Sequence, residues 1–169
     1  MQAAFTSASD TQTLDELYKA IGFTVIQWGQ AEQSLDFLVL TLFHDCGGAK
    51  KLSKNKKIPV MLKPKLEYLE NCLSQLSELA SLKEEGLALV AIFTRLSQKR
   101  HDLIHSTVTT LTPVDDAFTF RKLDSMSDGV PSAREFKFKL TEFPTWKKEL
   151  MSLGANSADY AHKVFDQIN

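Results

Sequence analysis

Arg100, His101, Asp102 and His105 lie within one segment of the chain, Arg-His-Asp-Leu-Ile-His. An arginine guanidinium is always charged, and its planar fork matches the oxygens of a phosphate group. A histidine titrates near neutral pH and can accept or donate a proton. Together these side chains can cleave RNA without a metal. A histidine removes the proton of a ribose 2′-hydroxyl, whose oxygen attacks the adjacent phosphorus, and the arginine stabilises the charge on the phosphoryl oxygens.

The spacing of these residues constrains how they can act together. A second group must protonate the leaving 5′ oxygen, and one copy of the segment does not readily fill both roles, so we expect a two-fold homodimer. In a helix, His101 and His105 are four positions apart and share a face. Arg100 and His105 are five positions apart, about 140° around a straight helix. The helix must therefore distort at its end, or the arginine must bend into the same cleft.

Other roles for the same residues stay open. His101 and His105 have the spacing of a metal-binding pair, which needs a third ligand. The candidates for that ligand are His44, His162 and Glu32. Alternatively, His105 interacts with the negative end of its helix and Arg100 makes a surface ion pair. The chain has no glycine-rich phosphate loop, no Gly-x-Ser-x-Gly and no His-Glu-x-x-His, and we expect neither a metal nor a cofactor.

Most of the elements that must position this segment are predicted to be helices, because their apolar residues recur at helical spacing. A first helix is predicted from near Leu14, with Asp10 or Thr13 as its cap and the preceding residues 1–12 flexible, to a stop at Cys46-Gly47-Gly48. A second begins at Pro59 or Pro64 and continues through Leu76, because proline is tolerated only in a first turn. A third covers Leu82 to about His105, which places the Arg-His segment at its end.

The period then changes to the alternation typical of strands. Strands are predicted over Ser106–Leu111, Ala117–Leu123 and Glu135–Phe143, with turns at 113–116 and 128–131. A last helix begins at Pro144, with a break expected at Gly154. The predicted fold is a mainly α single domain over residues 1–169, a four-helix bundle with a small antiparallel β insertion at 106–143 before the last helix.

The order arginine, polar residue, three residues, histidine at the end of the third helix of a bundle resembles the HEPN superfamily (higher eukaryotes and prokaryotes nucleotide-binding). The resemblance covers the four-helix layout, and its specific part is Arg100, His101 and His105. It implies a homodimeric, metal-independent endoribonuclease in which Arg100 and His105 are catalytic and His101 assists. Glu32, in a Trp-Gly-Gln-Ala-Glu segment that also looks like the family, and Asp102 are expected to support the site.

Further consequences follow from the same resemblance. Many such enzymes are toxins of toxin–antitoxin systems or antiviral effectors, so an antitoxin or regulatory protein is an expected partner beside the RNA substrate. A subgroup carries a tyrosine two residues past the histidine, where this chain has Thr107. A nucleotidyltransferase partner is therefore not expected. The alternative is a catalytically inactive HEPN-like helical module that binds a nucleotide, RNA or a protein.

The positive and negative charges of the whole chain nearly cancel, but they are unevenly distributed along the sequence. Lys plus Arg is 20 and Asp plus Glu is 21, a net charge of −1, which argues against a protein that coats nucleic acid by charge alone. Residues 49–65 nevertheless hold seven lysines and no acid. They are either a solvated loop or a contact for RNA phosphates. The RNA-contact candidates are Lys50, Lys51, Lys54, Lys56 and Lys57.

The cellular compartment is predicted from the absence of a membrane helix, of a secretory signal pattern and of paired cysteines in the sequence. No stretch approaches the roughly 18 uncharged apolar residues of a membrane helix, and the first residues do not have the pattern of a secretory signal. Cys46 and Cys72 are isolated, without a Cys-x-x-Cys pair. We expect two reduced thiols in a cytoplasmic protein that does not bind membranes.

Overall fold

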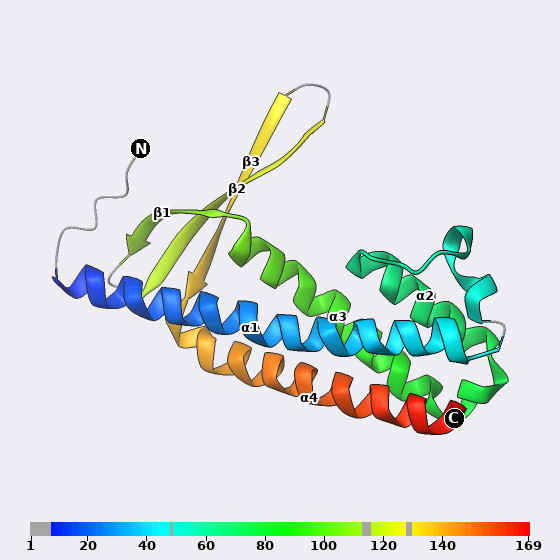
Figure 1. Cartoon of the computed structure of the whole chain (residues 1–169). Coiled ribbons are helices and arrows are strands. Elements are labelled where there is room, and N and C mark those ends of the chain that lie inside the picture. The colour runs from blue at the N-terminus through cyan, green and yellow to red at the C-terminus, as the bar shows by residue number, and fades with distance from the viewer. Residues whose placement is uncertain (1–7, 48, 113–115, 128–129) are drawn as a thin grey trace. The chain divides into compact units, whose positions relative to one another are not determined.

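The computed structural model describes residues 8–47, 49–112, 116–127 and 130–169 (Figure 1). The main elements in chain order are α1 (Ala8–Asp45), α2 (Leu62–Gln75), α3 (Lys83–Ile104), β1 (Thr107–Thr112), β2 (Ala117–Ser127), β3 (Val130–Lys139) and α4 (Phe143–Ile168). Short 3-10 turns are η1 (Ala49–Leu52), η2 (Lys54–Lys56), η3 (Ser77–Leu82) and η5 (Leu140–Glu142). The predicted mainly α fold, with four helices and a small antiparallel sheet before the last one, is confirmed.

Several predicted helix boundaries differ from those observed. α1 begins at Ala8, so Asp10 and Thr13 lie inside the helix rather than at its cap, and residues 8–12 are helical. Residues 1–7 lie outside the described part of the chain. Pro64 lies in the first turn of α2, where its missing N–H removes no helical hydrogen bond. α4 continues through Gly154 without a break, because one glycine disfavours a helix by only about 1 kcal/mol.

The strands also differ in length from those predicted. β2 extends to Ser127 and β3 begins at Val130, because backbone pairing continues beyond the alternating apolar residues. β3 ends at Lys139, and the next three residues form η5 rather than strand. The predicted turns include residues 113–115 and 128–129, which lie outside the described ranges.

Two compact units make up the chain. The first unit comprises Met1–Ile26 and Ser97–Glu149, and the second comprises Gln27–Leu96 and Leu150–Asn169. The two units divide three helices between them. One part of each of α1, α3 and α4 belongs to the first unit, and the rest of that helix belongs to the second. No helix among the described residues combines the length and apolar character needed to cross a membrane.

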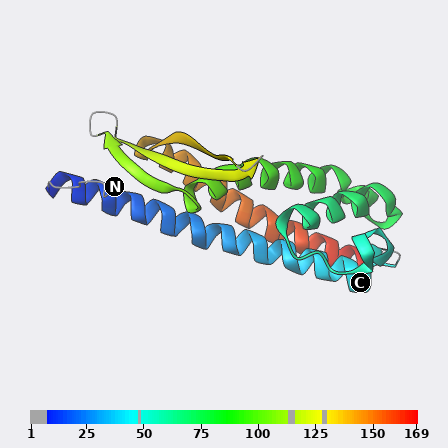
Figure 2. The same ribbon diagram turned by 90° about the horizontal axis from the view of Figure 1, so that it is seen from above.

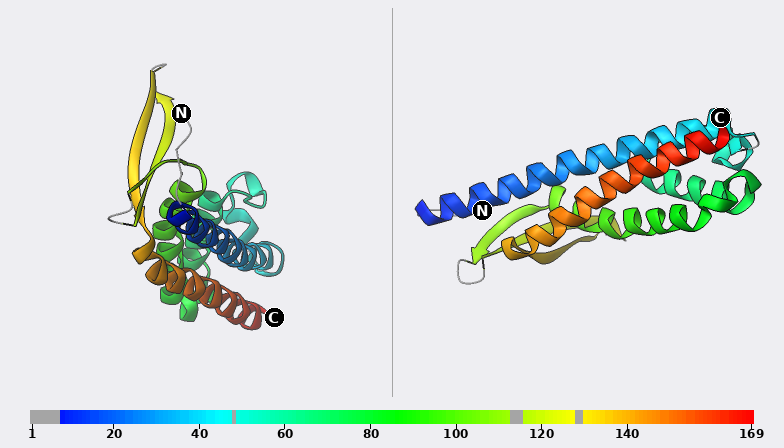
Figure 3. Two further views of the ribbon diagram at one scale, coloured as in Figure 1. Left: turned by 90° about the vertical axis from the view of Figure 1, so that its left-hand side faces the viewer. Right: turned by 90° about the horizontal axis from the view of Figure 1, so that it is seen from below.

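The sheet and a buried hydrogen-bond chain organise the first unit. Its strands are antiparallel in the order β1-β2-β3, and Figures 2 and 3 show β2 and β3 as a long hairpin. Phe120 and Phe136 are paired across this hairpin with stacked rings 5.1 Å apart. Trp146 Nε1 donates to Thr24 Oγ1 at 3.0 Å, and Thr24 Oγ1 donates to the Ala20 carbonyl at 2.8 Å. The start of α4 is thereby joined to α1 through buried polar groups.

Aromatic and leucine side chains form the core of the second unit. Trp28 contacts Phe93 edge-to-face, with ring centroids 5.8 Å apart. The buried Tyr160 hydroxyl donates to the Leu82 carbonyl at 3.1 Å. A Cβ atom at Gly86 would lie 2.3 Å from the Tyr160 hydroxyl oxygen, so only glycine fits this close approach of α3 and α4.

Candidate functional site

The Arg-His segment ends α3 in the first unit. His101 and Asp102 lie in the last turn of α3, Arg100 directly precedes them, and His105 directly follows the helix. The backbone N–H of His105 donates to the His101 carbonyl at 3.0 Å, which continues the helical hydrogen-bond pattern to this residue. The two imidazoles therefore lie on one side, with ring centroids 4.6 Å apart and planes inclined by 50°. The predicted shared face of His101 and His105 is confirmed.

Solvent reaches both imidazoles. His101 and His105 are exposed, whereas Arg100 is half-buried. Arg100 precedes His101 directly, about 100° away around the helix, and its positive charge acts on that imidazole. The predicted reach of Arg100 into a common cleft with His105 stays a prediction.

The pKa of His101 is lower than that of an ordinary histidine. Partial desolvation is the largest cause, followed by the positive charges of Lys122 and His105. Asp102 opposes this effect but does not outweigh it. The imidazole of His101 is consequently neutral at neutral pH and can accept a proton.

Asp102 points to the sheet instead of to solvent. Its buried carboxylate accepts hydrogen bonds from Lys122 Nζ at 2.7 Å, from the guanidinium of Arg134 and from the Gln98 amide at 3.0 Å. Burial alone would raise the pKa of this carboxyl, but these bonds lower it to about 2. Asp102 is thus a fixed anion at neutral pH that joins the end of α3 to β2 and β3, and it is not a proton-transfer group.

The sequence predicted a supporting role for Asp102 but missed its partners. Lys122 and Arg134 are directly paired across β2 and β3. Like charges at opposite positions of a sheet destabilise it, and Asp102 lies between them as their shared counter-ion. The spacing of Gln98 and Asp102 was the one signal visible in the sequence, because residues four apart on a helix are neighbours.

The other predicted supporting and RNA-contact residues belong to the second unit. Glu32 is half-buried in the second unit's portion of α1, and its predicted support of the Arg-His segment stays a prediction. The five predicted lysines are exposed in and after η1 and η2. Lys50 lies over the Phe43 ring, with Nζ 5.4 Å from its centroid.

The metal alternative lacks a third ligand in the described part of the chain. Among those residues, no group of three or more His, Cys, Asp and Glu side chains could hold a metal ion. His44 and His162 are exposed residues of the second unit, on α1 and α4. Cys46 and Cys72 are both free and buried.

Comparison of the chain with protein-family models, curated proteins and solved structures finds no match. Its chemistry must therefore be inferred from the arrangement of its own residues.

Proposed function

We propose that the protein is a metal-independent endoribonuclease of HEPN type that acts as a homodimer. One observation carries the proposal. The solvent-exposed imidazoles of His101 and His105 lie side by side at the C-terminal end of α3, and His101 directly follows Arg100. The carboxylate of Asp102 instead accepts a hydrogen bond from Lys122 of the sheet. A neutral base, a second proton-transfer group and a phosphate-binding cation are the groups that metal-free RNA cleavage requires.

The proposed reaction is an internal transfer at one phosphodiester. His101, neutral because of its lowered pKa, accepts the proton of the ribose 2′-hydroxyl. The 2′ oxygen forms a bond to phosphorus, and the bond from phosphorus to the 5′ oxygen breaks. His105 of the second copy in the homodimer donates a proton to that leaving oxygen, and Arg100 stabilises the charge on the non-bridging oxygens. The products are a 2′,3′-cyclic phosphate and a 5′-hydroxyl end.

Exposed apolar residues on α1 support the homodimer. In the first unit, Tyr18 is 59% exposed, Val25 is 45% exposed and Ile26 is 63% exposed. Tyr18 and Val25 are seven positions apart and lie on one face of the helix. A second copy packed on this face would remove them from water. Val25→Glu is expected to convert the dimer to a monomer, measured by light scattering during size-exclusion chromatography.

Single substitutions test the catalytic assignment. RNA is incubated with purified protein in chelator, and the ends of the products are identified. Arg100→Ala, His101→Ala and His105→Ala are each expected to lower the rate by roughly 10² to 10⁴, the contribution of a positioned catalytic group. His44→Ala and His162→Ala, two exposed histidines of the second unit, are the matched controls. Unchanged cleavage by a correctly folded His105→Ala protein contradicts the assignment.

Expression in bacteria tests the proposed biological role as a toxin or antiviral effector. Growth arrest by the wild-type chain, abolished by Arg100→Ala or His105→Ala, is the expected result. Growth unaffected by either wild type or variants contradicts a toxic nuclease. It favours the inactive helical module that binds a nucleotide, RNA or a protein.

A further inference from the structure

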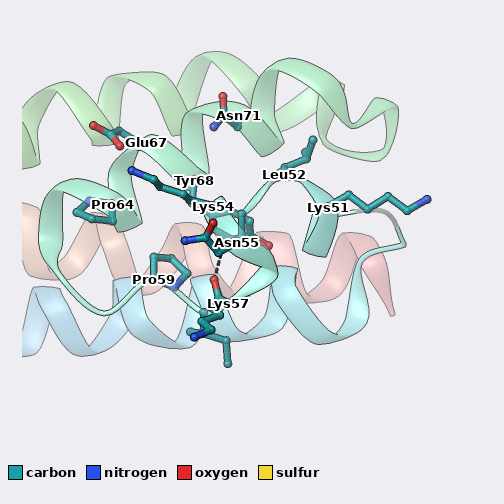
Figure 4. A pocket seen from close by; sticks show the side chains of 12 residues that line it. Lys51, Leu52, Lys54, Asn55, Lys57, Pro59, Pro64, Glu67, Tyr68 and Asn71 are labelled. Atoms are coloured by element: carbon teal, nitrogen blue, oxygen red, sulfur yellow. Dashed lines mark hydrogen bonds between the residues drawn. The ribbon is translucent and has the colours of Figure 1, made fainter.

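A pocket in the second unit lies outside the proposed nuclease site. It has a volume of about 630 Å³ (Figure 4). Its lining comes from residues 51–55 and 57–59 and from Pro64, Glu67, Tyr68 and Asn71 of α2. Sites for small molecules typically measure about 300–1,000 Å³. The pocket is therefore large enough for a small organic ligand.

The charge of the lining is mainly positive. Lys51, Lys54 and Lys57 contribute to it, and Glu67 is the acid among the lining residues. Glu67 is itself 3.9 Å from the ammonium of Lys63, outside the lining. Lys51, Lys54 and Lys57 are in none of the ion pairs among the described residues. Unpaired cations around a concave surface concentrate anions there.

Hydrogen bonds hold the lysine-bearing turn in one conformation. The buried Ser53 hydroxyl donates to the Lys57 carbonyl, drawn as a dashed line in Figure 4, and the Lys56 N–H donates to the Ser53 carbonyl at 3.0 Å. Asn55 and Lys56 both have left-handed backbones, with φ of 59° and 53°. This conformation is unfavourable for lysine, and such strain is maintained where the surrounding structure fixes it. The turn is thus preformed, which lowers the entropy lost on binding.

The remaining walls suit the organic part of a ligand. The rings of Pro59, Pro64 and Tyr68 provide apolar surface. The amides of Asn55 and Asn71 provide hydrogen-bond donors and acceptors beside it. A pocket with apolar walls and a few polar groups selects ligands that combine a ring or chain with a charged group.

We propose that this pocket binds a small organic phosphomonoester, independently of the proposed nuclease activity. A phosphomonoester carries a charge of about −1.5 to −2 at neutral pH, which favours its binding at a lining with more lysines than acids. Each phosphate of an RNA backbone carries a single charge, and a strand follows an extended groove. A discrete concave pocket favours the small dianion. The predicted contact of Lys51, Lys54 and Lys57 with RNA stays a prediction, and the experiment below distinguishes it from phosphomonoester binding.

Titration of ¹⁵N-labelled protein tests this proposal. Phenyl phosphate is expected to shift the amide signals of residues 51–58 and of the first turns of α2, with an affinity that strengthens as pH rises through about 6, where the second phosphate proton dissociates. Phenyl sulfate, of similar shape but with one charge, is expected to bind at least tenfold more weakly. Lys54→Gln/Lys57→Gln is expected to weaken phenyl phosphate binding at least tenfold. Lys137→Gln/Lys148→Gln, which removes two exposed lysines of the first unit, is expected to leave it unchanged.

Three results overturn the proposal. They are the absence of shifts at millimolar phenyl phosphate, equal weakening by both double variants, and equal affinity for phenyl sulfate. A 2′-O-methyl RNA octamer with a 5′-hydroxyl end cannot undergo 2′-hydroxyl attack and carries only diesters. If this octamer occupies the pocket more tightly than phenyl phosphate does, the lysines contact RNA instead. None of these outcomes depends on whether the protein cleaves RNA.

Discussion

Replacing Asp102 by asparagine isolates the anion that joins the end of α3 to the sheet. The substitution keeps the size of the side chain but removes the charge that Lys122 and Arg134 share. Lys122 is buried, so its ammonium loses its counter-ion in a site that water does not readily reach. We expect Asp102→Asn to destabilise the first unit at neutral pH.

The magnitude follows from the pKa of Asp102. Its decrease from 3.8 to about 2 on folding corresponds to about 2 kcal/mol of stability when the carboxylate is charged. Loss of one partner from a buried ion pair typically costs about 3–5 kcal/mol. We therefore expect Asp102→Asn to lower the free energy of unfolding by about 2–4 kcal/mol at pH 7. Because the folded-state pKa is depressed, the wild-type contribution is present above about pH 4 and is lost as pH falls toward 2.

Tryptophan fluorescence during urea unfolding measures this effect. Trp28→Phe serves as the common background, because it leaves Trp146 as the reporter of the first unit. Glu142→Gln is the control, since it breaks an exposed ion pair with Lys99 in the same unit and is expected to cost less than about 1 kcal/mol. The difference between Asp102→Asn and its background should shrink between pH 5 and pH 2, by about 2 kcal/mol.

A stability loss below about 0.5 kcal/mol at pH 7 would refute the role assigned to this carboxylate. So would a loss that does not change as pH falls. Lys122→Met in the Asp102→Asn protein removes the uncompensated ammonium and should restore part of the lost stability. Failure of this second change to restore any stability would show that the two side chains do not interact.

Two further predictions concern packing and proton affinity. Gly86→Ala should destabilise the second unit by about 1–3 kcal/mol because its Cβ would overlap the Tyr160 hydroxyl, whereas Gly154→Ala in open space should stabilise the protein by up to about 1 kcal/mol; equal unfolding midpoints for the two variants would contradict this. His101 should titrate below pH 6.5 by NMR, and Lys122→Met should raise its pKa, because a neighbouring positive charge is removed. A His101 pKa that does not respond to Lys122→Met would show that this charge does not act on the imidazole.

Most of the helical framework was predictable because periodicity and helix-ending signals are local. The apolar spacing through Leu42 and the stop near Gly47 located α1, and the third helix was correct to within one residue at each end. The predicted ends of helices and strands were wrong where contacts with other parts of the chain determine where an element begins or ends. The first turns of α1 carry no strong apolar pattern, and the lengths of β2 and β3 depend on mutual backbone pairing.

The candidate site was predictable only in part, for a related reason. The contact of His101 with His105 follows from their spacing on a helix. The partners of Asp102 follow from the register that pairs Lys122 with Arg134, which no local pattern specifies. The pocket could likewise not be predicted from the sequence. It forms only because the lysine-rich segment turns and lies beside α2.

In the proposed function, the imidazoles of His101 and His105 at the end of α3 transfer protons in metal-free RNA cleavage. The most direct measurement is the ³¹P NMR spectrum of a short RNA incubated with the protein in excess chelator. We expect a 2′,3′-cyclic phosphate signal with wild type and with His162→Ala, and its loss with His101→Ala and with His105→Ala. An unchanged RNA spectrum with wild type, or the same cyclic product with His105→Ala, would contradict it.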